Sequence, residues 1–119
     1  MPMAEERPQR GVENPSVIDL ITPDPETGEV VLIMLEQREW SDDIARLKQL
    51  EDKINAYLVF VLDGFLVSEY PEYEGRPVRI QLDCSQTPPS DSRAESMLIA
   101  ARNYASSNDV NFAIKRIED

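Results

Sequence analysis

Hydrophobic and polar positions along the chain predict four strands. Residues 16–21 (SVIDLI) form a short strand, and 29–36 (EVVLIMLE) is apolar on both faces, as expected for a strand buried on two sides. The intervening 22–28 (TPDPETG) is dense in turn residues, so the two strands should form an antiparallel hairpin. Residues 78–84 (VRIQLDC) alternate strictly, and 109–117 (DVNFAIKRI) alternate through Val110, Phe112 and Ile114.

The segment between residues 42 and 70 admits three structures. Asp63-Gly64 could be a two-residue hairpin turn, the interior of a long helix, or the point where a helix ends. We favour one helix running through Gly64 and ending before Pro71. Apolar residues recur there at spacings of three and four, at positions 44, 47, 50, 54, 57, 58, 61, 62, 65 and 66.

Capping residues predict where both helices begin. Ser41 is the expected N-cap of the long helix, with Asp42 and Asp43 in its first turn. Ser92 and Glu95 fit a capping box for a second helix that ends near residue 106. The residues of that helix expected to face the core are Met97, Leu98, Ala101, Tyr104 and Ala105.

The predicted order is therefore β-β-α-β-α-β. Right-handed crossovers would make a mixed four-stranded sheet with two helices, an α/β (α+β) fold. The 119 residues suffice for one domain, which we assign to residues 16–119. Residues 1–15, with three prolines among charged residues, are expected to be a flexible leader.

Composition disfavours several classes of partner. The net charge of −11, from 23 acidic and 12 basic residues, repels phosphate backbones and anionic lipids, so neither nucleic acid nor a membrane is expected as a partner. The chain opens without an apolar signal segment, and its longest apolar run, 56–62, is too short to span a bilayer. A cytoplasmic protein is the simplest interpretation.

Candidate catalytic chemistry is limited because the chain contains no histidine. Ser-His-Asp triads, Cys-His dyads and His-ligated zinc are therefore excluded. Cys84 follows a predicted strand, but Pro88 and Pro89 in the next loop have no N–H to offer an oxyanion. We expect Cys84 to be a small buried residue.

Carboxylates are the remaining candidates for a metal site. Asp19, Glu29 and Glu36 are the residues to suspect, because divalent cations need several convergent oxygens. Asp19 with Glu36-Gln37-Arg38 resembles the pattern of some metal-dependent nucleases, but Arg38 replaces the lysine of that pattern. A solvated acidic turn is the simpler explanation, and no metal or cofactor is predicted.

Three stretches together resemble a family of small bacterial cytosolic proteins known only as a domain of unknown function. These stretches are ITPDPETGEVVLIMLEQREW, KINAYLVFVLDG and YPEYEGRPVRIQLDC. The resemblance covers about residues 16–85. It implies no activity, ligand or site residue.

The long helix differs between its two halves. Its first half should carry Arg46, Asp52 and Lys53 on the outer face, whereas its second half is apolar nearly all round. The residues that point away from the expected core stripe are Ala56, Val59, Phe60 and Val67. Either another part of the chain covers them or a partner does, most simply in a two-fold homodimer.

These observations favour a small acidic, non-catalytic protein-interaction domain that homodimerises. A carboxylate-based metal-dependent hydrolase or nuclease is the alternative. A third hypothesis is an acidic decoy that binds a basic partner.

Overall fold

Four strands form one mixed sheet in the computed structural model, which describes residues 18–41 and 43–117. The first two strands pair antiparallel and the other two join in parallel, in the order β1-β2-β3-β4. This arrangement confirms the predicted hairpin, both parallel crossovers and the central place of the second strand. The strands are β1 (Leu20–Pro23), β2 (Val30–Glu36), β3 (Val78–Cys84) and β4 (Val110–Arg116).

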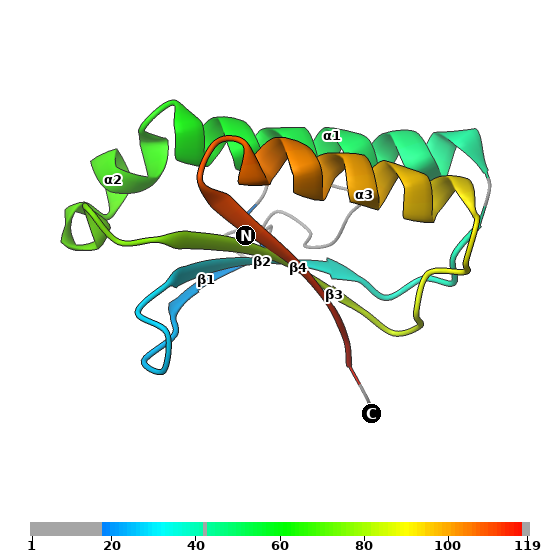
Figure 1. Cartoon of the computed structure of the whole chain (residues 1–119), viewed down its shortest axis with the longest axis horizontal. Helices are drawn as coiled ribbons and strands as arrows, with labels where there is room; N and C mark the ends of the chain where they lie inside the picture. Colours follow the sequence, from blue (N-terminus) through cyan, green and yellow to red (C-terminus); the bar gives the residue numbers. More distant parts are fainter. Residues whose placement is uncertain (1–17, 42, 118–119) are drawn as a thin grey trace, which may run out of the picture.

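The two main helices lie side by side on one face of the sheet (Figure 1). Each follows a strand and returns the chain to the next parallel strand. A short helix and a 3-10 turn, which the sequence did not predict, fill the connection to β3. The bounds are α1 (Ile44–Leu62), α2 (Phe65–Glu69), η2 (Pro71–Tyr73) and α3 (Arg93–Ser106). The leader expected at residues 1–15 lies outside the described residues.

The hydrophobic core lies between this helix layer and the sheet. Alternate strand residues face the helices, because successive side chains of a strand point to opposite faces. Neighbouring strands are in register, so their apolar residues form continuous rows under α1 and α3. The buried core residues are Val30, Leu32, Met34, Ile80, Leu82, Val110 and Phe112 from the strands, and Leu50, Ile54, Tyr57, Leu58, Leu66, Leu98 and Ala105 from the helices.

The long helix ends at Leu62, so the predicted continuous helix through Gly64 is wrong, and so is the hairpin. Gly64 has φ of 87°, a left-handed conformation that glycine adopts without the clash of a Cβ. The amide of Asp63 still donates to the carbonyl of Val59, which closes the last turn of α1. The chain then starts α2 in a new direction. The third alternative, a break at Gly64, agrees with the structure.

The cap of α1 also differs from its prediction, whereas that of α3 is confirmed. Asp43 is the N-cap, and its carboxylate accepts a hydrogen bond from the amide of Ala45. Ser41 lies one step outside, where its hydroxyl accepts from the amide of Asp43. At α3, the hydroxyl of Ser92 accepts from the amide of Glu95, as the capping box requires.

Three smaller differences concern strand and helix faces. The first strand is shifted, since β1 begins at Leu20 and reaches into the predicted turn as far as Pro23. Tyr104 is exposed although a core position was predicted, and Ile114 is exposed although it shares the face of Phe112. Tyr104 lines a groove between α1 and α3, which leaves its side chain open to solvent.

Within residues 18–41 and 43–117, none of the helices has the length and apolar character needed to cross a membrane.

Candidate functional site

Asp19 and Lys53 form an ion pair in the interior, between the start of β1 and the middle of α1. The ammonium nitrogen of Lys53 lies 2.9 Å from Oδ1 of Asp19, and both side chains are completely shielded from solvent. The other carboxylate oxygen accepts from the amide of Leu35 at 2.9 Å. Asp19 therefore holds together β1, β2 and α1, and a cation already neutralises it.

Tyr57 completes this buried cluster one helical turn beyond Lys53. Its hydroxyl donates to the carbonyl of Ile33 at 2.7 Å and accepts from the amide of Asp19 at 2.8 Å. Burial, more than the nearby charge of Asp19, raises the pKa of the Tyr57 phenol above its usual range. The phenol stays neutral and joins the two strands of the hairpin to the helix.

The burial of Lys53 corrects the sequence prediction, which placed it on the outer face of the helix. Lys53 lies about 100° round the helix from Ile54. The core stripe of α1 is rotated towards it, with Leu50 and Tyr57 buried on that side. The sequence pattern centred the predicted core stripe near Ile54, Val61 and Phe65, which placed Lys53 outside it.

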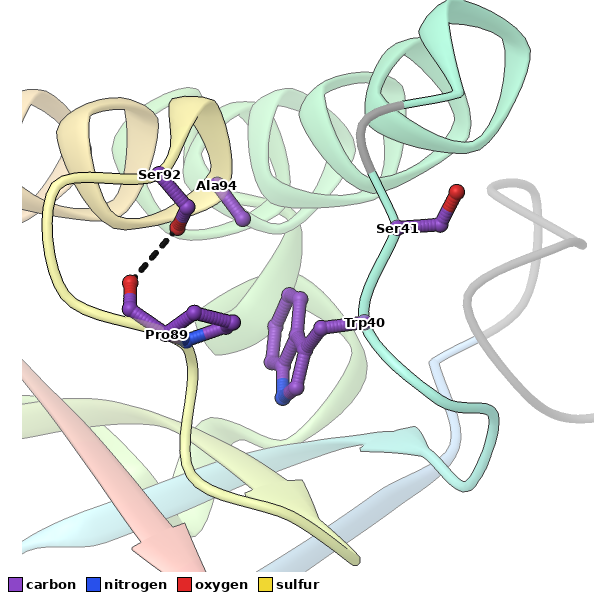
Figure 2. Close-up of a pocket in the computed structure, with 5 residues that line it drawn as sticks. All are labelled: Trp40, Ser41, Pro89, Ser92 and Ala94. Carbon is purple, nitrogen blue, oxygen red and sulfur yellow. Dashed lines mark hydrogen bonds between the residues drawn. The ribbon is translucent and has the colours of Figure 1, made fainter.

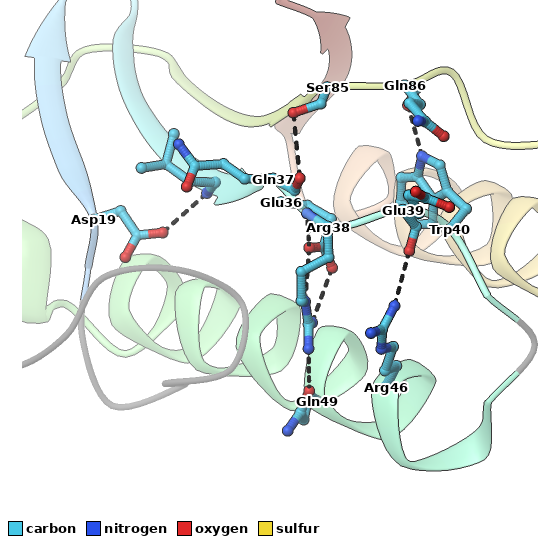
Figure 3. A network of polar contacts seen from close by, with 11 residues as sticks. Asp19, Glu36, Gln37, Arg38, Glu39, Trp40, Arg46, Gln49, Ser85 and Gln86 are labelled. Carbon is cyan, nitrogen blue, oxygen red and sulfur yellow. Dashed lines mark hydrogen bonds and ion pairs between the residues drawn. The ribbon is translucent and has the colours of Figure 1, made fainter.

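Glu36, at the end of β2, is engaged by a different cation. The guanidinium of Arg38 donates to both carboxylate oxygens of Glu36, each at 3.0 Å. The guanidinium also donates to the side-chain oxygen of Gln49 on α1 at 2.8 Å (Figure 3). This fork-to-fork pair links the end of β2 to the start of α1.

Glu29 is held on the other face of the sheet, at the beginning of β2. Its carboxylate accepts from the guanidinium of Arg79 on β3 and from the side-chain amide of Asn111 on β4, the latter at 2.6 Å. Arg79 also donates to Asp24 in the hairpin turn at 3.1 Å. The Asn111 hydrogen bond is the main cause of a lowered pKa at Glu29, and a hydrogen bond from the amide of Glu26 is the main cause at Asp24.

The three suspected metal ligands therefore do not come together. Glu29 directly precedes β2 and Glu36 is its last residue, so the two lie on opposite faces, roughly 20 Å apart at the rise of a strand. Asp19, Glu29 and Glu36 each pair with a separate cation. In the part of the chain that the structure describes, no group of three His, Cys, Asp or Glu residues is placed to hold a metal ion.

Cys84 is buried at the end of β3, as predicted. Its thiol contacts the carbonyl of Lys115 at 3.6 Å. Burial, and then the negative charges of Asp83 and Glu36, raise the pKa of the thiol. This environment is the opposite of the one that activates a nucleophilic cysteine.

A hollow of about 170 Å³ lies where the loops before α1 and α3 meet (Figure 2). Trp40 and Pro89 form opposite walls, and the indole N–H donates to the carbonyl of Gln86 at 2.6 Å. The hydroxyl of Ser92 donates to the carbonyl of Pro89 at 2.7 Å while it caps α3. The indole hydrogen bond thus fixes the two loops to each other, and the Ser92 hydroxyl fixes the second loop to the start of α3.

The end of α1 and the start of α2 expose apolar side chains. We call this region the tip surface: Ala56, Val59, Phe60, Leu62, Phe65 and Val67. Val59 is 49% exposed, Leu62 41% and Phe65 51%. Of the four predicted contact residues, Ala56, Phe60 and Val67 are half-buried, and only Val59 is clearly exposed. Leu62 and Phe65 are exposed as well, but the sequence pattern did not predict them as contact residues.

Phe60 is covered in part within the chain. Its ring stacks on that of Phe65, with centroids 6.5 Å apart and an angle of 20° between the planes. The break at Gly64 turns α2 so that Phe65 can reach Phe60. Intramolecular cover, the alternative considered from the sequence, therefore explains part of the tip surface.

A groove between α1 and α3 borders the tip surface. It contains two adjoining hollows of about 190 Å³ and 350 Å³, which share Asn55, Leu58 and Tyr104. Val59 and Leu62 line the larger hollow beside Tyr104. The exposure of Tyr104 was the feature hardest to foresee, because its helical spacing matches that of core residues.

Comparison with models of protein families gives a match over most of the chain. A family of unknown function, DUF6572, matches residues 10–118. The chain belongs to the DUF6572 family. This confirms the resemblance to a domain of unknown function, and the match extends well beyond the stretch of about residues 16–85 that carried it. Neither the curated proteins nor the solved structures include a match.

Proposed function

We propose that this member of the DUF6572 family is a small acidic cytosolic protein-interaction domain without catalytic activity, and that it homodimerises through the tip surface. One observation carries the proposal. Val59, Leu62 and Phe65 lie within seven residues of each other and remain between 41% and 51% exposed. Large exposed apolar side chains concentrated in one short stretch of the chain favour an interaction site there.

A two-fold interface suits this surface. In a two-fold dimer the same patch serves both subunits, so an apolar patch without a strong charge pattern is complementary to itself. The three exposed side chains are apolar, and their burial would add roughly 25 cal/mol per Å² of area removed from water. Phe60 and Phe65 stack on each other, so the aromatic part of the patch is already ordered before association.

The polar arrangements elsewhere in the fold support a role without catalysis. The acidic residues suspected from the sequence form ion pairs that connect secondary-structure elements. Cys84 is buried with a raised pKa. Each of these groups has a structural explanation.

The test compares two single substitutions that add the same charge at similar exposure. Val59→Glu places a carboxylate in the tip surface, whereas Ile99→Glu places one at a 43% exposed position of α3 outside it. We expect Val59→Glu to convert the dimer to a monomer in sedimentation velocity and Ile99→Glu to leave it dimeric. Equal behaviour of the two variants would overturn the proposed interface.

A further inference from the structure

The outer edge of β4 has no strand partner within residues 18–41 and 43–117. Seven residues long and without proline, β4 differs from the other edge strand, β1, which has four residues and ends at Pro23. An uninterrupted edge of this length presents a row of backbone donors and acceptors to another strand.

The backbone geometry identifies which groups are available. The amide of Ile117 donates to the carbonyl of Cys84, and the register pairs Arg116 with Cys84. Backbone groups of successive residues point to opposite edges of a strand, so the odd-numbered residues of β4 bond to β3. Phe112, Ile114 and Arg116 therefore direct their N–H and C=O groups outwards.

Side chains beside this edge provide apolar contact. Ile114 is 42% exposed, although it continues the row that begins with the buried Val110 and Phe112. On α3, Ile99 lies on the side turned away from Met97 and Tyr104, which line the groove with α1. Ile99 is also exposed, so apolar surface flanks the helix side of the edge.

Charge identifies the partner. Lys115 and Arg116 are exposed at the end of β4, and neither has an ion-pair partner among the described residues. The end of β4 therefore carries two adjacent cations on a chain with a net charge of −11. If two copies paired antiparallel about Ala113, Lys115 would face Asn111 and Arg116 would face Val110, so neither would meet an acid.

We propose that the β4 edge binds an extended acidic segment of another protein as a fifth, antiparallel strand. Its acidic residues lie opposite Arg116 and Lys115, and its apolar residues lie opposite Ile114 and Phe112. Backbone hydrogen bonds supply most of the affinity, and the two cations set the direction and register of the segment. This surface is separate from the tip surface and does not depend on homodimerisation.

The probe is a fluorescently labelled heptapeptide with blocked termini and the sequence Glu-Asp-Val-Thr-Val-Thr-Val. Its binding to the protein is measured by fluorescence anisotropy. Antiparallel pairing places its Glu opposite Arg116 and its last Val opposite Val110. We expect saturable binding, at least about tenfold weaker for a peptide with two lysines in place of the acids. N-methylation of the Val opposite Phe112 should abolish binding, because it removes a donor to the edge. Equal affinity for the acidic and basic peptides, or unchanged affinity after N-methylation, would overturn the proposal.

Two further measurements use the protein itself. In the free protein, hydrogen exchange should be fast at the amides of Phe112, Ile114 and Arg116 and slow at those of Ala113 and Lys115. Slow exchange at the amides of Phe112, Ile114 and Arg116 in the free protein would show that the edge is already covered, and would contradict the proposal.

Charge reversal has a matched control. Arg116→Glu should weaken acidic-peptide binding several-fold, and Arg76→Glu, the same charge change in an exposed loop, should not. Equal weakening by the two substitutions would show that the peptide responds only to the net charge of the protein, and would contradict binding at the β4 edge. The monomeric Val59→Glu variant should bind the peptide as wild type does, which separates this site from the proposed dimer.

Discussion

The ammonium of Lys53 contacts the carboxylate of Asp19 in the interior of the protein, with no solvent access to either side chain. We expect Lys53→Met to lower the free energy of unfolding by about 3–5 kcal/mol, because it leaves a buried carboxylate without its cation. Urea unfolding followed by circular dichroism measures this loss.

The control for this prediction changes both partners. In Lys53→Met/Asp19→Asn the buried charge is gone, and the amide oxygen can still accept from the amide of Leu35. Stability should partly recover relative to Lys53→Met. A cost below about 1 kcal/mol for the single variant would mean that the pair is not buried in solution.

The effect of Gly64→Ala on stability should have opposite signs for a helix that breaks at Gly64 and for one that continues through it. At φ of 87°, a Cβ is disfavoured, so Gly64→Ala should destabilise the protein by about 1–2 kcal/mol, and Gly64→Asn by less. Inside a continuous helix, the same alanine would stabilise by up to about 1 kcal/mol. Thermal unfolding of the wild-type protein and the two variants distinguishes the two structures. A Gly64→Ala variant more stable than the wild type would favour the uninterrupted helix.

The carboxylates around Arg79 predict acid sensitivity. The pKa values of Asp24 and Glu29 are lowered in the folded protein from ordinary values of 3.8 and 4.5. Their contribution to stability is therefore complete above those values and is lost as the pH falls through the folded values. Urea unfolding at pH 7 and at pH 3 should show a loss of stability in the wild-type protein.

Arg79→Leu tests the contribution of the guanidinium to this acid sensitivity. Without it, the pKa values of both carboxylates should rise only part of the way to their ordinary values, because the hydrogen bonds from Asn111 and from the amide of Glu26 remain. The loss between pH 7 and pH 3 should therefore shrink in part, and an unchanged loss would show that the guanidinium does not contribute to it.

Cys84 should react slowly with thiol reagents. Burial raises the pKa of its thiol and denies access to the reagent. Alkylation by iodoacetamide at neutral pH should be much slower in the native protein than in the same protein unfolded in guanidinium chloride. Similar rates in the two states would show that the end of β3 is open.

The sequence predicted the fold because the strand patterns are set locally. The continuous apolar run of β2 and the strict alternation of β3 each identify a strand without knowledge of its neighbours. The capping box at Ser92 was equally local, since its hydrogen bond spans three residues.

The features that were missed depend on distant residues or on backbone conformation. Lys53 is buried because Asp19, 34 positions earlier, meets it beneath α1. Gly64 adopts a left-handed conformation although apolar spacing continues across it. Tyr104 follows the helical period, yet it lines the groove between α3 and α1 and stays exposed. The tip surface was only partly predicted, because Phe65 moves onto it through the break at Gly64.

The mass of the wild-type protein in solution tests the proposed homodimer most directly. Sedimentation equilibrium at tens of micromolar should give twice the 13.6 kDa chain mass, and the Val59→Glu variant should give the chain mass with unchanged circular dichroism. A wild-type protein that sediments at the mass of one chain under these conditions would contradict the proposal that the tip surface joins two copies.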